Sequence, residues 1–359
     1  MRALLVALLS LSAFSNAQEK LRVGIVGLTH GHAAGFFNNF LSRADIDIAG
    51  ISEPDKALAE KYAARYKLDP SRMFASHAEM LDRAKPEAVM IFTSTVEHKD
   101  IVEECARRKI HAMMEKPLAV SNEHARAMAA AARRGGIHVM VNYETTWYGV
   151  NTPIWKMARE DKSLGEIRRI VTHYGHQGPK EIGVGPEFLG WLTDPAKNGA
   201  GALFDFGCYG ANFATWLFDN QRPLSVSATT RTNKPEFYAR VDDEATVVVQ
   251  YPKAQLVIQP SWNWPFSRKD MEVYGQSGQL ITSNPTNYRF RTKSMKAEQA
   301  ETAAPLAAPE DDVLHYLAAV VRGRIKPAGL SSLENNLIVT EILDAARESA
   351  RTGRVVMFR

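Results

Sequence analysis

The chain has 359 residues, of which 45% are hydrophobic and 23% are charged, a balance that excludes fibrous and intrinsically disordered proteins. The formal net charge is only +4, and no basic run is long enough to indicate binding to nucleic acid. A single hydrophobic core rarely grows beyond about 250 to 300 residues, so we expect two domains.

The first 17 residues have the composition of a secretory leader. Arg2 precedes an apolar stretch over residues 3–14, and small residues end at Ala17 before the polar Gln18. The stretch is shorter than the about 20 residues that a transmembrane helix needs. We therefore expect residues 1–17 to be a cleaved signal peptide. The mature protein is then exported, in the periplasm and without a membrane anchor, or cytoplasmic if the leader does not function.

Short β-branched runs alternate with helical stretches from residue 21 onward, which predicts βαβ units and a parallel sheet. The predicted strands cover residues 21–26, 46–51, 88–92, 111–114 and 138–141, and the predicted helices cover 55–66, 77–83, 99–109 and 122–134. We therefore predict an α/β Rossmann domain over residues 18–141.

The pattern changes after residue 143, where strands follow one another without intervening helices. They cover residues 167–174, 224–232, 244–251, 255–262 and 270–274, with helices over 151–160, 205–218 and 333–351 and a surface loop over 293–309. We predict an α+β domain over residues 142–359 with an open, mainly antiparallel sheet. Its alternating strands would expose an apolar face, so we expect this face to pair subunits of a homo-oligomer.

A turn that binds a dinucleotide is predicted after the first strand. Gly27 begins a G-x-G-x-x-G pattern in which Thr29 and His32 replace the second and third glycines. Glu53 ends the second strand, where a carboxylate binds ribose hydroxyls and repels a 2′-phosphate, which favours NAD over NADP. The alternative is that Glu53 only caps the next helix. Because no carboxylate or cysteine stands at ligand spacing around His30 and His32, we predict no metal site.

Glu115-Lys116-Pro117 follows the strand over 111–114, at the sheet edge where α/β proteins bind ligands. The alternative is that Glu115 and Lys116 are a solvated pair on the surface. The triplet resembles the Glu-Lys-Pro signature of the Gfo/Idh/MocA oxidoreductases. Residues 199–210 resemble that family's glycine-rich active-site helix, with the D-x-G-x-[HY] core at Asp205 and Tyr209.

The resemblance implies an NAD-dependent oxidoreductase that acts on a CH–OH group of a sugar or sugar derivative. Lys116, Asp205 and Tyr209 would be catalytic, with Tyr209 taking the hydroxyl proton and Asp205 holding the substrate or orienting Lys116. Asp205 and Tyr209 are four residues apart and would share one helix face. We expect the Lys116 ammonium to lower the pKa of Tyr209. The alternative is that Tyr209 is only a tyrosine of the hydrophobic core.

Two sets of binding residues complete the prediction. The cofactor set is Gly27, Thr29, His30, His32, Glu53, Thr93, His98, Glu115 and Lys116. His176 and Trp191 are the candidates for contact with the sugar, since an indole face stacks on sugar rings and polar tips bind hydroxyls.

Export limits the mechanism, because no large pool of free NAD exists outside the cytoplasm. One solution is a permanently bound dinucleotide that couples the oxidation of one sugar to the reduction of another. A second is a redox-neutral glycosidase. It would oxidise the sugar transiently, eliminate the aglycone, add water and then return the hydride to the sugar. A non-catalytic carbohydrate-binding protein is a third alternative, which the altered glycine turn permits.

Overall fold

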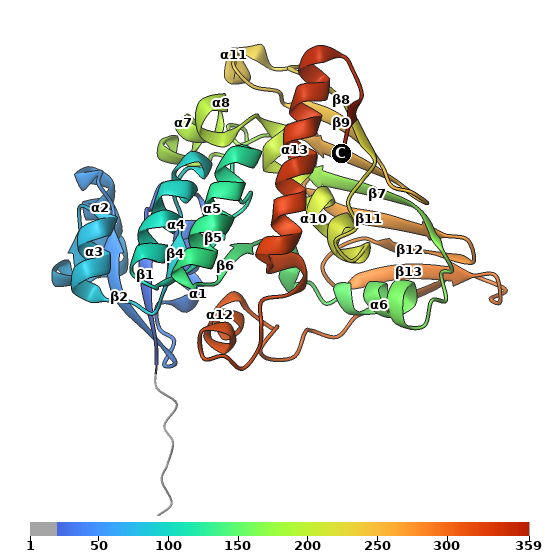
Figure 1. The fold of residues 1–359 in the computed structure, drawn as a ribbon. Helices are drawn as coiled ribbons and strands as arrows, with labels where there is room; N and C mark the ends of the chain where they lie inside the picture. Colours follow the sequence, from blue (N-terminus) through green and yellow to red (C-terminus); the bar gives the residue numbers. More distant parts are fainter. Residues whose placement is uncertain (1–19, 359) are drawn as a thin grey trace, which may run out of the picture.

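The computed structural model describes residues 20–358, so the predicted leader lies outside the described residues. The chain forms two β-sheets with helices between and around them (Figure 1). All neighbouring strands of the first sheet are parallel. It has the order β3-β2-β1-β4-β5-β6, with β1 (Leu21–Val26), β2 (Ile46–Ser52), β3 (Met73–Phe74), β4 (Ala88–Ile91), β5 (His111–Glu115) and β6 (Val139–Asn142). This is the doubly wound order of a Rossmann domain, as predicted.

Helices cover both faces of the first sheet, which is why its strands are almost uniformly apolar. One face packs against α1 (His32–Phe40), α2 (Lys56–Tyr66) and α12 (Val313–Val321). The other packs against α3 (His77–Ala84), α4 (His98–Arg107) and α5 (Asn122–Gly135). Short helical turns lie at Pro70–Arg72 and Thr95–Glu97.

The second sheet has nine strands and is mainly antiparallel, as predicted. Only β7 and β10 pair in parallel. The order is β14-β13-β12-β11-β7-β10-β9-β8-β15, with β7 (Ile167–Gly175), β8 (Ser225–Arg231), β9 (Glu244–Gln250), β10 (Gln255–Ser261), β11 (Arg268–Gly275), β12 (Gly278–Thr282), β13 (Asn287–Thr292), β14 (Gln299–Thr302) and β15 (Val356–Met357).

One face of the second sheet is covered by α10 (Gly207–Leu217) and α13 (Leu333–Thr352), which lie between the two sheets in Figure 1. Because α13 also contacts α5 and β6, one apolar core continues from the first domain into the second. The remaining helical segments are Glu144–Trp147, α6 (Asn151–Trp155) with a wider turn at Lys156–Glu160, α7 (Pro186–Leu192), α8 (Pro195–Asn198), α9 (Ala202–Asp205), α11 (Pro235–Tyr238) and Gly329–Ser331.

The opposite face of the second sheet is less apolar than the sequence suggested. Val248, Val257 and Val171 pair across three adjacent strands and are each half-buried. Arg169 and Thr246 on the same face are exposed, so the valines form a narrow stripe among polar residues. The predicted large apolar patch is therefore wrong, although the pairing of subunits through this face remains untested.

Three further predictions need correction. The region 142–359 does not all belong to the second domain, because α12 packs into the core of the first sheet. The predicted loop over 293–309 contains β14, an exposed edge strand whose backbone pairing leaves no apolar pattern in the sequence. The predicted helix over 205–218 is interrupted at Phe206, between α9 and α10. Within residues 20–358, no helix has the length and apolarity needed to cross a bilayer.

Candidate active site

A buried ion pair joins the two domains. Lys116 follows β5 of the first sheet, and its ammonium donates to the Asp205 carboxylate at the end of α9 and, over 3.1 Å, to the Asp205 carbonyl. Each side chain is only 6% exposed. The indole N–H of Trp262 donates to the second carboxylate oxygen of Asp205 over 2.9 Å. Lys116 is therefore oriented by Asp205, one of the two roles predicted for that carboxylate.

The two charges stabilise each other against the cost of burial. Burial alone would lower the pKa of Lys116, but the facing carboxylate outweighs it and raises that pKa above its ordinary value. Burial likewise favours protonated Asp205, yet the ammonium holds the pKa of Asp205 below its usual range. Both groups therefore remain charged across the neutral pH range.

Tyr209 lies in α10 beside this pair, inside a group of aromatic rings. The Lys116 Nζ is 5.3 Å from the centre of the Tyr209 ring. Tyr174 stacks on Tyr209 at 5.3 Å between centroids, and Tyr143 meets it edge-on at 5.4 Å. The Tyr209 hydroxyl forms no hydrogen bond with any other residue in the described part of the chain.

The expected lowering of the Tyr209 pKa is wrong. Burial, followed by the neighbouring Cys208 and Glu144, raises the pKa of Tyr209 well above its ordinary value. The Lys116 charge does not offset this, because that ammonium is already paired with Asp205. Tyr209 therefore carries its proton at neutral pH.

A second cation lies close to Tyr209. Lys269 in β11 lies 5.5 Å from the centre of the Tyr209 ring and forms an ion pair with Glu144. Burial would raise the pKa of Glu144, but Lys269 lowers it below the ordinary value. Glu144 is the second residue after the end of β6, so the rule that sites form at the carboxyl edge of a parallel sheet could have found it.

The glycine turn is built for close approach of a ligand to the backbone. Gly27 has φ +78°, and a β-carbon there would overlap with the Thr93 methyl group. Glu53 accepts the Leu28 N–H over 2.7 Å and the Asp55 N–H over 2.9 Å. Glu53 thus fixes the turn as well as the start of the next helix region, while its oxygens still have lone pairs for ribose hydroxyls.

Two buried imidazoles beside this turn each have one ring nitrogen without a hydrogen-bond partner among the described residues. His30 accepts the His32 N–H at Nδ1, so its Nε2 carries the proton, and this Nε2 is buried with no hydrogen-bond partner among the described residues. Burial holds the pKa of His30 well below its usual value, so the ring is neutral. The Nε2 of His98 is equally buried and has no partner among the described residues, but it is an acceptor, because Nδ1 donates to the Leu118 carbonyl over 3.2 Å and burial keeps the ring neutral. The His30 donor fits a phosphate or amide oxygen of a dinucleotide, and the His98 acceptor fits an amide N–H.

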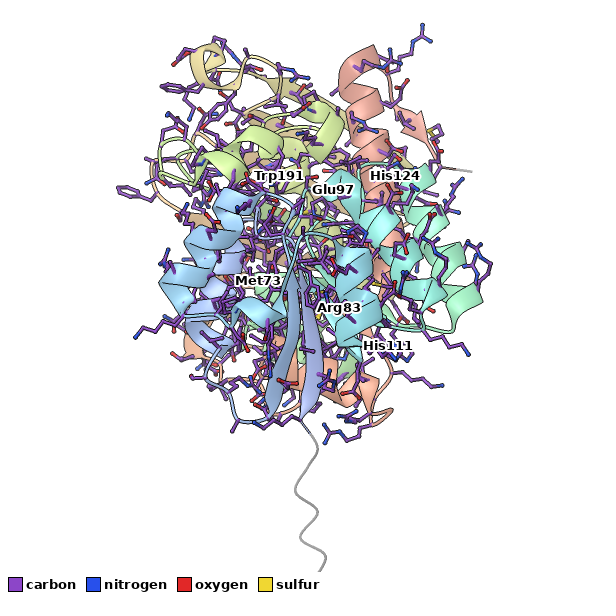
Figure 2. All side chains as sticks on the ribbon, turned by 90° about the vertical axis from the view of Figure 1, so that its left-hand side faces the viewer. Met73, Arg83, Glu97, His111, His124 and Trp191 are labelled. Atoms are coloured by element: carbon purple, nitrogen blue, oxygen red, sulfur yellow. The ribbon has the colours of Figure 1, made fainter. Side chains whose placement is uncertain are left out.

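A helix of the second domain covers the turn. The indole N–H of Trp191 in α7 lies 3.4 Å from the Thr29 carbonyl, and Phe188 packs on the His30 ring at 4.7 Å. Figure 2 shows Trp191 at the level where the strands of the first domain end. Trp191 therefore contacts the nucleotide turn and not the Lys116 pair.

His176 lies nearer to the Lys116–Asp205 pair. Its ring meets Phe206 edge-on at 4.9 Å, and the charges of Asp205 and Lys116 act on its pKa, which burial lowers. Of the two residues predicted to contact a sugar, His176 is therefore the one beside Lys116.

Glu115 is held by hydrogen bonds on both carboxylate oxygens. His32 Nδ1 lies 3.0 Å from one oxygen, and the Asn142 amide donates to the other over 2.9 Å. Asn142 in turn accepts the Trp147 indole N–H over 3.0 Å. The possible ligand atoms of His30, His32 and Glu115 all lie within 4.8 Å of one another. Sequence spacing could not show this cluster, because Glu115 is 83 residues from His32.

The structure thus gathers the predicted cofactor residues at the carboxyl ends of β1, β2, β4 and β5, and Lys116, Asp205 and Tyr209 beside them. Sequence reasoning missed Tyr143, Tyr174 and Lys269 around Tyr209, and it did not identify Trp262 as a partner of Asp205. Trp262 is completely buried and serves Asp205. Strand register decides which residues of the second sheet face this site. A short window of sequence does not reveal that register.

Comparison with known proteins agrees with this geometry. A family model described as an oxidoreductase family with an NAD-binding Rossmann fold matches residues 21–143, and a GFO/IDH/MocA C-terminal domain model matches residues 155–281. Fold and matches together define an NAD-binding oxidoreductase. The chain belongs to the Gfo/Idh/MocA family.

Similar proteins are known in both sequence and structure. A trans-1,2-dihydrobenzene-1,2-diol dehydrogenase of Xenopus laevis is 23% identical over 318 residues, covering 86% of this chain and 91% of the relative. An aldose-aldose oxidoreductase of Caulobacter crescentus, solved with glycerol, has a TM-score of 0.80, 22% identity and coverage of 95% and 100%. An inositol dehydrogenase homologue of Azotobacter vinelandii, solved with NAD+, has a TM-score of 0.81, 17% identity and coverage of 95% and 98%.

We expect Asp205→Asn to lower the free energy of unfolding by about 3 to 5 kcal/mol near pH 7, because it leaves a buried ammonium unpaired. In the variant, burial then lowers the pKa of Lys116 below its unfolded value, so stability rises with pH above that lowered pKa. Urea unfolding between pH 7 and 10 should show the difference from wild type shrinking. The control is Asp219→Asn, which breaks an exposed pair with Arg159 and should cost less than about 1 kcal/mol.

Gly27→Ala should weaken NAD binding at least about tenfold, because the left-handed backbone disfavours a β-carbon and the Thr93 methyl group occupies its position. Isothermal titration with NAD measures this. The control is Gly190→Ala in α7, where a β-carbon would meet nothing within 4 Å. Equal affinities of the two variants would contradict a nucleotide turn at Gly27.

Proposed function

We propose that this protein is an NAD-dependent oxidoreductase that acts on a CH–OH group of a sugar or a sugar-like cyclic polyol. The observation that carries the proposal is the buried Lys116–Asp205 pair beside the protonated Tyr209, at the sheet edge next to the glycine turn. It offers two hydrogen-bond donors to one oxygen in a site from which water is largely excluded.

The residues around the turn fit the dinucleotide. Gly27 allows close backbone approach, Glu53 is placed for the ribose hydroxyls, and the unpartnered His30 Nε2 is a donor for an oxygen of the cofactor. The Glu53 carboxylate favours NAD over NADP, because it would repel a 2′-phosphate. When bound, NAD supplies the hydride acceptor. Glu115 and His98, at the ends of β5 and β4, would border it.

The chain's own residues handle the substrate oxygen and its proton. The Lys116 ammonium, fixed by Asp205, stabilises negative charge that develops on the carbinol oxygen. Tyr209 exchanges the hydroxyl proton. Because its pKa is raised, Tyr209 stays protonated and is present as the proton donor for a carbonyl being reduced, whereas the oxidation of an alcohol needs the scarce phenolate.

The relatives support a polyol substrate. By their names, the similar proteins act on a dihydrodiol, an aldose or an inositol, all of which carry neighbouring hydroxyl groups. His176, beside Phe206 and near Asp205, is the residue we assign to a second substrate hydroxyl.

The raised pKa of Tyr209 predicts the pH dependence of the reaction. The rate of polyol oxidation should rise about tenfold per pH unit from roughly pH 7 to 9, because the phenolate fraction rises by that factor. Tyr209→Phe should lower kcat by about 10² to 10⁴ and abolish this slope. NADH formation with a panel of aldoses and inositols, followed by absorbance, measures both effects.

The control is Tyr251→Phe, which removes a buried hydroxyl that follows β9 and lies beside Thr215, away from the Lys116–Asp205 pair. It should keep both rate and slope. A bell-shaped profile centred below pH 7, retained in Tyr209→Phe, would rule out Tyr209 as the proton-exchanging group. Release of aglycone from aryl glycosides without net NADH would favour the redox-neutral glycosidase instead.

We propose in addition that the protein is exported and forms a homo-oligomer through the outer face of the second sheet. The leader composition supports export, and the valine stripe across β9, β10 and β7 supports pairing. Intact-mass measurement of protein secreted by a bacterial host should give a chain beginning at Gln18. A mature chain that retains Met1 would refute export by cleavage after Ala17.

A further inference from the structure

A second cavity lies apart from the Lys116 pair. It has a volume of about 350 Å³ and is formed by the segment after β6, by α6 and α10, and by the chain around α12. Its size is at the lower end of the range of small-molecule sites. None of its lining residues belongs to the catalytic or cofactor sets described above.

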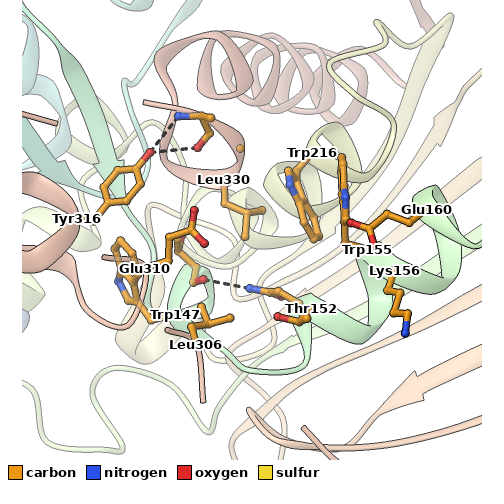
Figure 3. A pocket seen from close by; sticks show the side chains of 14 residues that line it. Trp147, Thr152, Trp155, Lys156, Glu160, Trp216, Leu306, Glu310, Tyr316 and Leu330 are labelled. Atoms are coloured by element: carbon orange, nitrogen blue, oxygen red, sulfur yellow. Dashed lines mark hydrogen bonds between the residues drawn. The ribbon is translucent and has the colours of Figure 1, made fainter. Parts of the chain in front are cut away.

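Aromatic rings form two walls of this cavity. Trp155 and Trp216 stack at 4.9 Å between centroids on one side, and Trp147 meets Tyr316 edge-on at 5.6 Å on the other. Figure 3 shows the two pairs facing each other, with Leu330 between them. The rings come from three regions of the chain, around residues 147–155, 216 and 316, so only the fold brings the two walls together.

Polar groups with no protein partner complete the lining. The carboxylates of Glu160 and Glu310, and the indole N–H groups of Trp155 and Trp216, form no hydrogen bond or ion pair with other described residues. In Figure 3, Glu310 extends between the two aromatic walls, while the Lys156 amino group points away from the cavity. Free acceptors and free donors therefore stand beside aromatic faces.

We propose that this cavity is a second carbohydrate-binding site, for a pyranose ring. The C–H face of a pyranose packs on an indole, and its hydroxyls donate to carboxylates and accept from indole N–H groups. No apolar ligand would use the four free polar groups. An organic cation would use the carboxylates and ring faces but leave the indole donors unpaired.

The tryptophans themselves provide the test. The chain has six. Trp147, Trp155 and Trp216 line the cavity. Trp262 contacts Asp205, Trp191 contacts the glycine turn and Trp264 packs against His173 and Arg268. We would label the full chain with 5-fluorotryptophan, assign each ¹⁹F resonance by single Trp→Phe substitution, and titrate D-glucose and D-galactose without NAD. The expected result is a saturable shift of the Trp155 and Trp216 resonances.

Glu310→Ala should weaken this binding at least about tenfold, because it removes a charged acceptor. The matched control is Glu236→Ala, an exposed glutamate of α11 that has no partner among the described residues and lies outside the cavity. It should bind as wild type does. Glu310→Ala should also keep the dehydrogenase activity, since Glu310 is not part of that machinery.

Three results would overturn the proposal: shifts confined to Trp262 and Trp191, shifts that do not saturate, or binding of choline in the cavity in place of either sugar. Because the titration needs neither NAD nor turnover, its failure is distinct from failure of the proposed oxidoreductase. A protein that oxidises no sugar can still bind one at this cavity.

Discussion

A lysine side chain that is 6% exposed can keep its charge only if something replaces the water that it lost. In this protein the replacement comes from the other domain. Asp205 approaches Lys116 from the start of the segment that leads into α10, and Trp262 holds the far oxygen of Asp205. One pair of charges therefore couples the positions of three elements: β5, which precedes Lys116, α9, which ends at Asp205, and β10, which precedes Trp262. Removing either Lys116 or Asp205 would leave the other charge buried among apolar groups without a partner.

The same contact places the proposed catalytic residues at the domain boundary. Tyr209 lies four residues after Asp205, just beyond the break between α9 and α10, so an Asp205 fixed on Lys116 also fixes the ring of Tyr209 against Tyr174 and Tyr143. The cost of this rigid, buried position is a phenol with a raised pKa. At neutral pH the populated form of Tyr209 is therefore the phenol and not the phenolate.

The nucleotide turn and the second cavity are connected by a series of hydrogen bonds. Trp147 borders both the second cavity and the cavity beside His32, and it donates to Asn142. Asn142 donates to Glu115, whose other oxygen pairs with His32. This series fixes the orientation of Glu115 next to Lys116. It also means that the wall of the second cavity is a structural support of the cofactor site.

The sequence by itself determined the elements that depend on local pattern. Alternating buried strands and helices identified the Rossmann domain, and a glycine turn, an acid after β2 and a lysine after β5 located its ligand edge, because carboxyl ends of parallel strands meet there. Asp205 and Tyr209 came from a motif resemblance and not from periodicity.

Only the tertiary structure decided the rest. Trp262 reaches Asp205 over 57 positions, α12 returns to the first sheet, and Trp191 covers the glycine turn from α7. These contacts depend on strand register and on long-range packing, which leave no signal within a short window of sequence. The pKa of Tyr209 belongs to the same class, because burial by distant rings outweighs the charge of Lys116, and burial is a property of the folded chain.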